Sequence, residues 1–179
     1  MDRWRVYVKI KAYCKREVGM SHKVSVIFVC LGNICRSPTA HAVFRDMVKQ
    51  EGLLEEILID SAGTASWHKG KPADSRSIQV AQNRGIEMMD LRSRPVDLGD
   101  LIEFDYILAM DDANYSDLME MALPEHHDKI KMFLEFAPAY PEMEVPDPYY
   151  GGSQGFDHVF NLVTAASNGL LEDIKQRHL

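Results

Sequence analysis

An apolar run followed by a ten-residue loop sequence constrains the fold most strongly. The run is Val-Ser-Val-Ile-Phe-Val at 24–29, and its β-branched residues predict a buried strand. The sequence Cys-Leu-Gly-Asn-Ile-Cys-Arg-Ser-Pro-Thr follows, in which Gly32 and Asn33 tolerate a positive φ. Ser37 and Pro38 suit the N-cap and the first position of a helix. The segment therefore predicts a strand, a tight loop and the start of a helix.

A thiol opens this loop and a guanidinium closes it. Five residues separate Cys30 from Arg36, which is enough chain for successive N–H groups to point inward around a small concavity. Such a concavity binds an oxyanion, and the arginine fork and the N-terminus of the following helix add positive charge. The loop therefore predicts a phosphate site with the sulfur of Cys30 beneath the phosphorus, placed for nucleophilic attack.

The octapeptide Leu-Gly-Asn-Ile-Cys-Arg-Ser-Pro at 31–38 carries a family resemblance. Together with the cysteine before it, the octapeptide resembles the signature loop of the low-molecular-weight protein tyrosine phosphatases. The resemblance extends over 23–179 and implies the flavodoxin-like fold of that family. It also implies hydrolysis of phosphotyrosine in proteins through a cysteinyl-phosphate intermediate, with Cys30 as nucleophile and Arg36 as phosphate ligand.

Beyond this loop, apolar strands alternate with amphipathic helices. Strands are expected at 56–61, near 88–93 and at 106–110, helices at 38–51, 74–84, 112–121 and 156–176, and either a short strand or a turn at 129–133. Strands separated by helices imply crossover connections, so the pattern predicts an α/β protein with an open four-stranded parallel sheet and helices on both faces. Its ligand site is expected beyond the C-terminal ends of the strands, where Cys30 lies.

The composition fits one domain and narrows the class of partner. The chain has 179 residues, of which 46% are hydrophobic, and its net charge of −7 leaves no broad cationic surface for nucleic acid. Its cysteines, Cys14, Cys30 and Cys35, form no even-numbered disulfide framework, so we expect the reducing cytoplasm. No apolar stretch of about 18 residues is present to span a membrane. We expect a monomer or a weak dimer that acts on phosphotyrosine-containing proteins.

Residues 1–22 are distinctly basic compared with the rest of the chain. Six arginines and lysines stand against two acidic residues there. We expect 1–22 to form a poorly ordered N-terminal extension and 23–179 to form the phosphatase domain. The alternation of apolar and polar residues at 4–11 leaves an added edge strand as the alternative.

A second motif supplies the acid that a phosphatase needs, because a thiolate cannot protonate a departing phenolate. The sequence Asp-Pro-Tyr-Tyr-Gly-Gly begins at Asp147, which lies between Pro146 and Pro148. By itself this motif is typical of a turn. The resemblance assigns the matching aspartate as general acid in the first step and as general base toward water in the second.

The resemblance also implies a substrate cleft and residues that support the loop. Trp67, Tyr149 and Tyr150 would line the cleft around a phenyl ring, although aromatic residues also commonly pack internally. The phosphate-binding and loop-supporting positions are Leu31, Gly32, Asn33, Ile34, Cys35, Ser37 and Ser61. From the chemistry of its hydroxyl, we expect Ser37 to stabilise Cys30 as the leaving thiolate.

Three residues near the loop raise separate questions. Leu91 stands where family members often carry a histidine, so the support of the loop is expected to be shortened or filled by water. His41 occupies a helix position that is often acidic in the family, and we interpret it as surface variation. Cys35 is a candidate for a reversible disulfide with Cys30, and an inert small residue is the alternative.

Several other activities remain open from the sequence. The adjacent pair His126 and His127 has no further ligand cluster, so we expect no metal and no cofactor. A glutathione-coupled arsenate reductase remains, since no redox cysteine follows Cys35 to support the thioredoxin-coupled type. In protein arginine phosphatases a threonine commonly replaces the residue at Ile34, so Ile34 favours phosphotyrosine. A non-enzymatic phosphate- or phosphopeptide-binding module is the last alternative.

Overall fold

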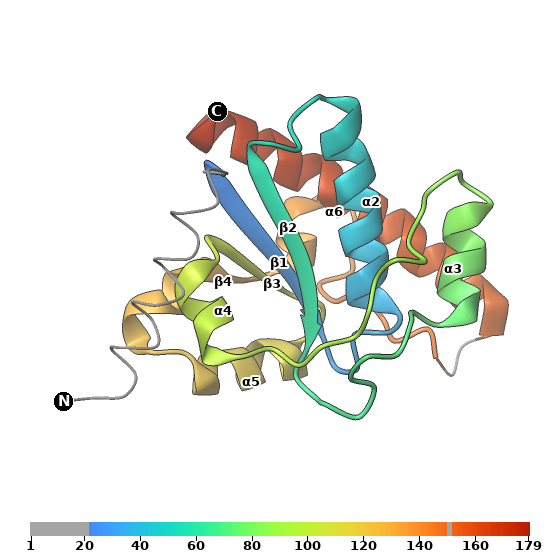
Figure 1. Ribbon diagram of the computed structural model, residues 1–179, viewed down its shortest axis with the longest axis horizontal. Coiled ribbons are helices and arrows are strands. Elements are labelled where there is room, and N and C mark those ends of the chain that lie inside the picture. Colours follow the sequence, from blue (N-terminus) through green and yellow to red (C-terminus); the bar gives the residue numbers. More distant parts are fainter. Residues whose placement is uncertain (1–21, 150–151) are drawn as a thin grey trace.

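The computed structural model describes residues 22–149 and 152–179 and has an α/β architecture (Figure 1). Its strands are β1 (Val24–Cys30), β2 (Ile57–Gly63), β3 (Tyr106–Ala109) and β4 (Ile130–Met132). Its α-helices are α2 (Arg36–Gln50), α3 (Ser75–Gln82), α4 (Leu98–Glu103), α5 (Asp112–Met121) and α6 (Gly152–His178), and its 3-10 helices are η1 (Pro124–Lys129) and η2 (Phe133–Phe136).

The four strands form one parallel sheet in the order β2-β1-β3-β4. Helices connect each strand to the next, as parallel pairing requires. In the register, Cys30 lies opposite Gly63, and Val29 lies opposite both Ala62 and Ala109. The C-terminal ends of these three strands therefore meet at one edge, from which the loop after β1 leaves. The predicted fold class is confirmed.

Helices cover both faces of the sheet. Figure 1 shows α2, α3 and α6 on one face and α4 and α5 on the other. Val26 and Phe28 belong to the first core, whereas Ile27 and Val29 belong to the second. Because every residue of β1 is buried, its sequence is a nearly continuous apolar run instead of an alternating one.

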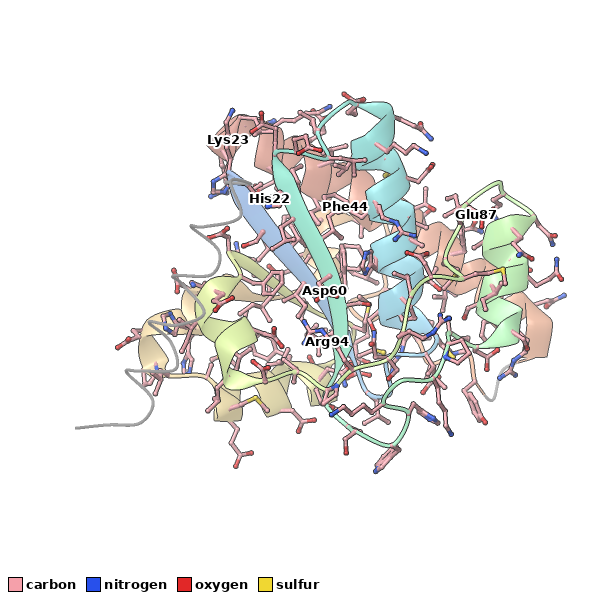
Figure 2. All side chains as sticks on the ribbon, viewed as in Figure 1. His22, Lys23, Phe44, Asp60, Glu87 and Arg94 are labelled. Atoms are coloured by element: carbon pink, nitrogen blue, oxygen red, sulfur yellow. The ribbon has the colours of Figure 1, made fainter. Side chains whose placement is uncertain are left out.

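Phe28 is the main aromatic contact between β1 and the elements that cover it. Its ring packs edge-on against Phe44 of α2, with centroids 5.7 Å apart, and against Phe133 of η2, at 5.0 Å. Figure 2 shows Phe44 on the side of α2 that faces the sheet. Each such pair adds about 1 kcal/mol beyond the burial of its area. This packing fixes α2, where the loop ends, relative to β1, where the loop begins.

The prediction of a strand near 88–93 is wrong. This segment forms only an isolated bridge, between Pro72 and Arg92, and it belongs to no ladder. Its buried apolar side chains are Met88 and Leu91, three residues apart, which does not match the two-residue period of a strand. The fourth strand is instead β4, within the stretch for which the sequence left strand and turn open.

The segment after the wrongly expected strand is tied to the sheet by Arg94. Its guanidinium donates to Asp60 of β2 at 2.7 Å and to Asp100 of α4 at 2.7 Å, and Figure 2 shows Asp60 and Arg94 close together. Burial opposes the cation, but the two carboxylates outweigh it and raise the pKa of Arg94. Arg94 therefore stays charged and holds its own backbone beside the end of β2.

Residues 1–21 lie outside the described residues, so the basic extension stays a prediction. Within the described ranges, no helix combines the length and the apolar character that crossing a bilayer demands.

Candidate active site

The loop between β1 and α2 curls around the sulfur of Cys30. Asn33 adopts the left-handed conformation expected for it, with a φ of 51°, whereas Gly32 does not. The Asn33 N–H donates to the Sγ atom of Cys30 at 3.3 Å. Cys30 ends a fully buried strand, so its thiol lies at the bottom of the loop, under the N-terminus of α2.

Helix α2 begins earlier than the sequence predicts. Its first residue is Arg36 and its N-cap is Cys35, so the expectation that Ser37 is the N-cap and Pro38 the first helical residue is wrong. The Ser37 hydroxyl is used inside the loop, where it accepts a hydrogen bond from Asn33 Nδ2 at 2.8 Å. Because no side chain caps α2, no capping oxygen occupies the N–H groups of its first turn, which suits an anion site.

The same hydroxyl reaches the candidate nucleophile. Ser37 Oγ lies 3.1 Å from Cys30 Sγ and 3.3 Å from the carbonyl oxygen of Ala62 on β2. All three groups are buried. Ser37 is therefore held between the strand edge and the sulfur, in position to donate to a thiolate.

The chain beside β2 supports the loop from outside. Asn33 Oδ1 accepts from the backbone N–H of Arg94 at 3.0 Å, and Ser93 Oγ donates to the carbonyl oxygen of Gly32 at 3.0 Å. Leu91 is buried in the core under α2. The sequence left the support in doubt because Leu91 cannot form hydrogen bonds. In the structure, a main-chain donor and a serine bond to the loop.

Two glycines allow other segments to approach the loop closely. A Cβ at Gly63 would lie 2.7 Å from the carbonyl oxygen of Leu31, which is backbone and cannot turn aside. A Cβ at Gly32 would lie 3.0 Å from Cδ2 of His68. Gly63 therefore lets the end of β2 pass under the loop, and Gly32 lets the His68 ring lie against it.

Arg36 is buried and surrounded by acceptors. Its Nη1 atom forms an ion pair with Asp111 and donates to the carbonyl oxygen of Val145 at 3.3 Å. Burial disfavours the cation, but electrostatic attraction to Cys30, Asp111 and Asp147 outweighs this penalty and raises the pKa of Arg36. The guanidinium is thus a permanent, buried cation beside the loop.

Asp147 faces Arg36 across the loop. Its Oδ2 atom lies 3.6 Å from Arg36 Nη2, and its Oδ1 atom accepts from the N–H of Tyr149 at 3.0 Å. The backbone before it is tied to the sheet, since the Val145 N–H donates to the carbonyl oxygen of Met110 at 2.8 Å. The carboxylate is partly exposed and therefore accessible to a group bound above the loop.

Cys30, Arg36 and Asp147 line one open cavity of about 270 Å³. Its mouth carries the aromatic side chains of Trp67, 70% exposed, and Tyr149, 46% exposed. The remaining lining residues are Leu31, Gly32, Ile34, Cys35 and His68. The cavity therefore combines a thiol and a cation at its base with a carboxylate on its wall and apolar rings at its rim.

Two loop-support candidates have surroundings that the sequence did not reveal. Burial, and next the charge of Asp74, raise the pKa of Cys35 to about 12, so at neutral pH it is a thiol. Ser61 Oγ on β2 lies 3.4 Å from Nδ1 of His41. His41 is buried, so its interpretation as surface variation is wrong. Burial, with Arg45 as the next cause, lowers the pKa of His41 to about 4.

Other predicted residues lie elsewhere or are not described. Tyr150 lies outside the described residues, and both Cys30 and Cys35 are free thiols, so the disulfide stays a prediction. Within 22–149 and 152–179, no group of three or more His, Cys, Asp or Glu side chains could hold a metal ion.

Sequence reasoning missed Asp111, which pairs with Arg36. Asp111 follows β3 after a single residue, at the same edge as the phosphate loop. A signal was available, because ligand sites of parallel sheets lie beyond the C-terminal ends of their strands. Asp111 also caps α5, accepting from the N–H of Asn114.

Comparison with known proteins also indicates a low molecular weight phosphatase, over nearly all of the residues that the structure describes. The family model described as low molecular weight phosphotyrosine protein phosphatase matches residues 25–178. A putative low molecular weight protein-tyrosine-phosphatase of Synechocystis is 41% identical over 152 residues, which cover 84% of this chain and 96% of the relative. The corresponding Bacillus subtilis protein, YfkJ, is 40% identical over 153 residues, covering 86% and 97%.

Solved structures agree in fold as well as in sequence. A protein tyrosine phosphatase of Entamoeba histolytica with Hepes in its active site superposes with a TM-score of 0.83 at 42% identity, covering 86% of this chain and 97% of that one. The crystal structure of YfkJ gives a TM-score of 0.83 at 40% identity, covering 88% and 98%. The chain therefore belongs to the low molecular weight phosphotyrosine protein phosphatase family.

Proposed function

We propose that the protein hydrolyses phosphotyrosine in proteins, with Cys30 as nucleophile, Arg36 as phosphate ligand and Asp147 as general acid and base. The observation that carries the proposal is that these three side chains line one cavity. We place the reaction in the cytoplasm because the cysteines form no disulfide framework. The partner is a phosphotyrosine-containing protein, and the enzyme acts as a monomer or a weak dimer.

In the first step the sulfur of Cys30 forms a bond to phosphorus as the bond from phosphorus to the phenolic oxygen breaks. Asp147 gives its proton to that oxygen, and tyrosine leaves. Arg36 and the N–H groups of the loop bind the equatorial oxygens, whose charge they stabilise most in the transition state. The partly exposed position of Asp147 above the loop supports this role.

In the second step water attacks the cysteinyl phosphate. Asp147, now a carboxylate, takes the proton of the water, and the bond from phosphorus to sulfur breaks to release inorganic phosphate. The sulfur leaves as a thiolate, to which Ser37 Oγ, 3.1 Å away, donates a hydrogen bond. The Asn33 N–H, whose nitrogen lies 3.3 Å from the sulfur, also donates to the thiolate and stabilises it.

The rim of the cavity supports an aryl phosphate as substrate. Trp67 and Tyr149 expose apolar rings at the mouth, where they can flank a phenyl group. Ile34 adds an apolar side chain to the lining, which favours a phenyl ring over a guanidinium group. We also propose that Tyr150 completes this cleft, because the matching residue lines the substrate cleft in members of the family.

A turnover assay tests the proposal. Wild-type protein is expected to hydrolyse a phosphotyrosine peptide much faster than phosphoserine and phosphoarginine peptides. Cys30→Ser is expected to lose turnover, and Asp147→Ala to lose about a hundredfold or more with poor leaving groups but far less with activated aryl phosphates. Equal rates in wild type and Cys30→Ser would rule out the mechanism. Faster phosphoarginine hydrolysis, or arsenate reduction with glutathione, would reassign the activity.

A further inference from the structure

An arginine outside the catalytic cavity connects the phosphate loop with the segment that carries the acid. Arg76 lies in the first turn of α3, and Asp74 is the N-cap of the same helix. Arg76 Nε donates to Asp74 Oδ1 and Arg76 Nη2 donates to Asp74 Oδ2, each at 2.9 Å. The backbone N–H of Asp74 donates to the carbonyl oxygen of Ile34 in the phosphate loop at 2.7 Å. Asp74 thus fixes Arg76 relative to the loop.

The other side of the guanidinium holds the acid segment. Arg76 Nη1 donates to the carbonyl oxygen of Tyr149 at 3.2 Å. The central carbon of the guanidinium lies 5.0 Å from the centroid of the Tyr149 ring and 4.5 Å from that of Phe156 on α6. A planar guanidinium can stack on rings and donate in its own plane at once, which an ammonium cannot.

Tyr149 passes this restraint to the catalytic carboxylate. Its carbonyl oxygen accepts from Arg76, and its N–H donates to Asp147 Oδ1 at 3.0 Å. The second oxygen, Oδ2, is then directed toward Arg36 Nη2, 3.6 Å away. A continuous set of hydrogen bonds therefore runs from the phosphate loop through Asp74, Arg76 and Tyr149 to the acid.

We propose that Arg76 is a positioning residue for the general acid, one that sets the height of Asp147 above the phosphate loop without touching the substrate. This inference rests on the function proposed above. The Arg76–Asp74 pair would keep Asp147 where it can protonate the leaving group, because a misplaced acid transfers its proton poorly. Binding and attack at phosphorus, which depend on the loop and Arg36, do not require it.

The leaving group separates this role from a structural one. Arg76→Met keeps an unbranched apolar stem against the two rings but removes the donors. We expect kcat/KM for phenyl phosphate to fall about tenfold, and that for dinitrophenyl phosphate to fall less than roughly twofold. The dependence of kcat/KM on leaving-group pKa therefore becomes steeper. Inhibition by inorganic phosphate stays unchanged. The ratio kcat/KM is used because it covers substrate binding and formation of the cysteinyl phosphate and does not depend on the later hydrolysis of that intermediate.

Arg84 provides a matched control. It also joins the α3 region to α6, with its guanidinium 4.4 Å from the Phe160 centroid and an ion pair to Asp157 at 2.8 Å. Among the described residues, the hydrogen bonds of its side chain go to Val80 and Asp157 and not to 145–149, the segment that carries the acid. Arg84→Met is expected to lower the thermal stability about as much as Arg76→Met does. It should keep the wild-type dependence of kcat/KM on leaving-group pKa. If Arg76→Met lowers kcat/KM equally for both substrates, or matches Arg84→Met, the positioning role is overturned.

A second variant covers the possibility that Arg76→Met does not fold. Arg76→Lys keeps the charge beside Asp74 but cannot reproduce the paired donors and stacking, so an intermediate steepening is expected. An unchanged dependence in Arg76→Lys, together with an equal loss in Asp74→Asn for both substrates, also overturns the proposal. Failure of the phosphatase function itself is distinct, since wild-type turnover would then not depend on Cys30.

Discussion

Arg36 and Asp111 form an ion pair between the start of α2 and the residue before α5, 75 positions apart in sequence. The two oxygens of Asp111 have different partners. Oδ2 binds Arg36 Nη1, whereas Oδ1 accepts the N–H of Asn114 at 2.7 Å and so caps α5. The cap immobilises the carboxylate, and the carboxylate in turn directs the guanidinium. A helix cap thus sets the orientation of the phosphate-binding side chain.

Asp111→Asn separates these two tasks. Asparagine is as good an N-cap as aspartate, so the helix is retained, but the charge that orients Arg36 is lost. We expect kcat/KM to fall about tenfold for all aryl phosphates alike, since phosphate binding does not depend on the leaving group. Inhibition by inorganic phosphate should weaken in parallel. Steady-state kinetics with two leaving groups measures both quantities.

Asp97→Asn is the control for this change. Asp97 caps α4 by accepting the N–H of Asp100 at 3.1 Å, and it lies outside the catalytic cavity. Its variant should keep the phosphate affinity of the wild type. An unaltered phosphate inhibition constant in Asp111→Asn would show that the ion pair does not orient Arg36.

Ser37→Ala is expected to slow the breakdown of the cysteinyl phosphate more than its formation. The hydroxyl lies 3.1 Å from the sulfur and donates to it most strongly when it leaves as a thiolate. Losing one such donor to a charged group costs about 2 kcal/mol, or roughly thirtyfold in rate. With an activated aryl phosphate, stopped-flow measurements should show a burst of phenol followed by a slow steady state. A variant with unchanged kcat and no burst would contradict this role.

Local sequence patterns accounted for several of the regular elements. The run before Cys30 predicted β1, and the 3.6-residue periodicity predicted α5 with its observed bounds, Asp112–Met121. The segment 88–93 misled the prediction because Arg92 lies opposite Pro72 in a single bridge set by tertiary contacts. Short elements such as α4 carry too few residues for a periodic signal.

The site was predictable where one motif held its residues together, and much less so where distant segments meet. Cys30 and Arg36 came from a single loop. Asp111 binds Arg36 from 75 positions away, and Arg76 reaches the carbonyl oxygen of Tyr149 from 73 positions away. The spacing of residues along the chain does not encode these pairings, although the place of Asp111 after β3 marked it as a candidate. The burial of His41 was missed because its polarity suggested a surface position, although the buried Phe44 and Val48, three and seven residues further on, share its face of α2.

Cys35→Ser should make oxidation by excess hydrogen peroxide irreversible, because a second equivalent of peroxide then oxidises the sulfenic acid of Cys30 to the sulfinic acid. Peroxide converts the Cys30 thiolate to a sulfenic acid, and the Cys35 thiolate then attacks that sulfur, forming the disulfide and expelling hydroxide. Because burial raises the pKa of Cys35 to about 12, its thiolate is scarce, and disulfide closure should accelerate about tenfold per pH unit near neutrality. Recovery of activity with dithiothreitol measures protection, and Cys14→Ser is the control. Equal recovery in Cys35→Ser would exclude the disulfide.

His41 makes stability depend on pH. Its pKa is lowered from an ordinary 6.5 to about 4 in the folded protein, first by burial and then by Arg45. Arg94 acts in the same direction, and Asp60 and Asp90 oppose it. Between these two pKa values the unfolded chain binds a proton that the folded chain does not. Stability therefore falls as the pH falls through this window, by about 3 kcal/mol at most, and His41 adds no further change below it.

His41→Gln should remove this contribution and flatten the decline of the free energy of unfolding between about pH 6.5 and pH 4. Urea denaturation at several pH values measures the slope, which separates the titration from any constant loss of packing. His158→Gln, at a position on α6 whose side chain is 47% exposed, should keep the slope of the wild type. A decline in His41→Gln as steep as that of the wild type would mean that other groups govern acid stability and that His41 titrates alike in both states.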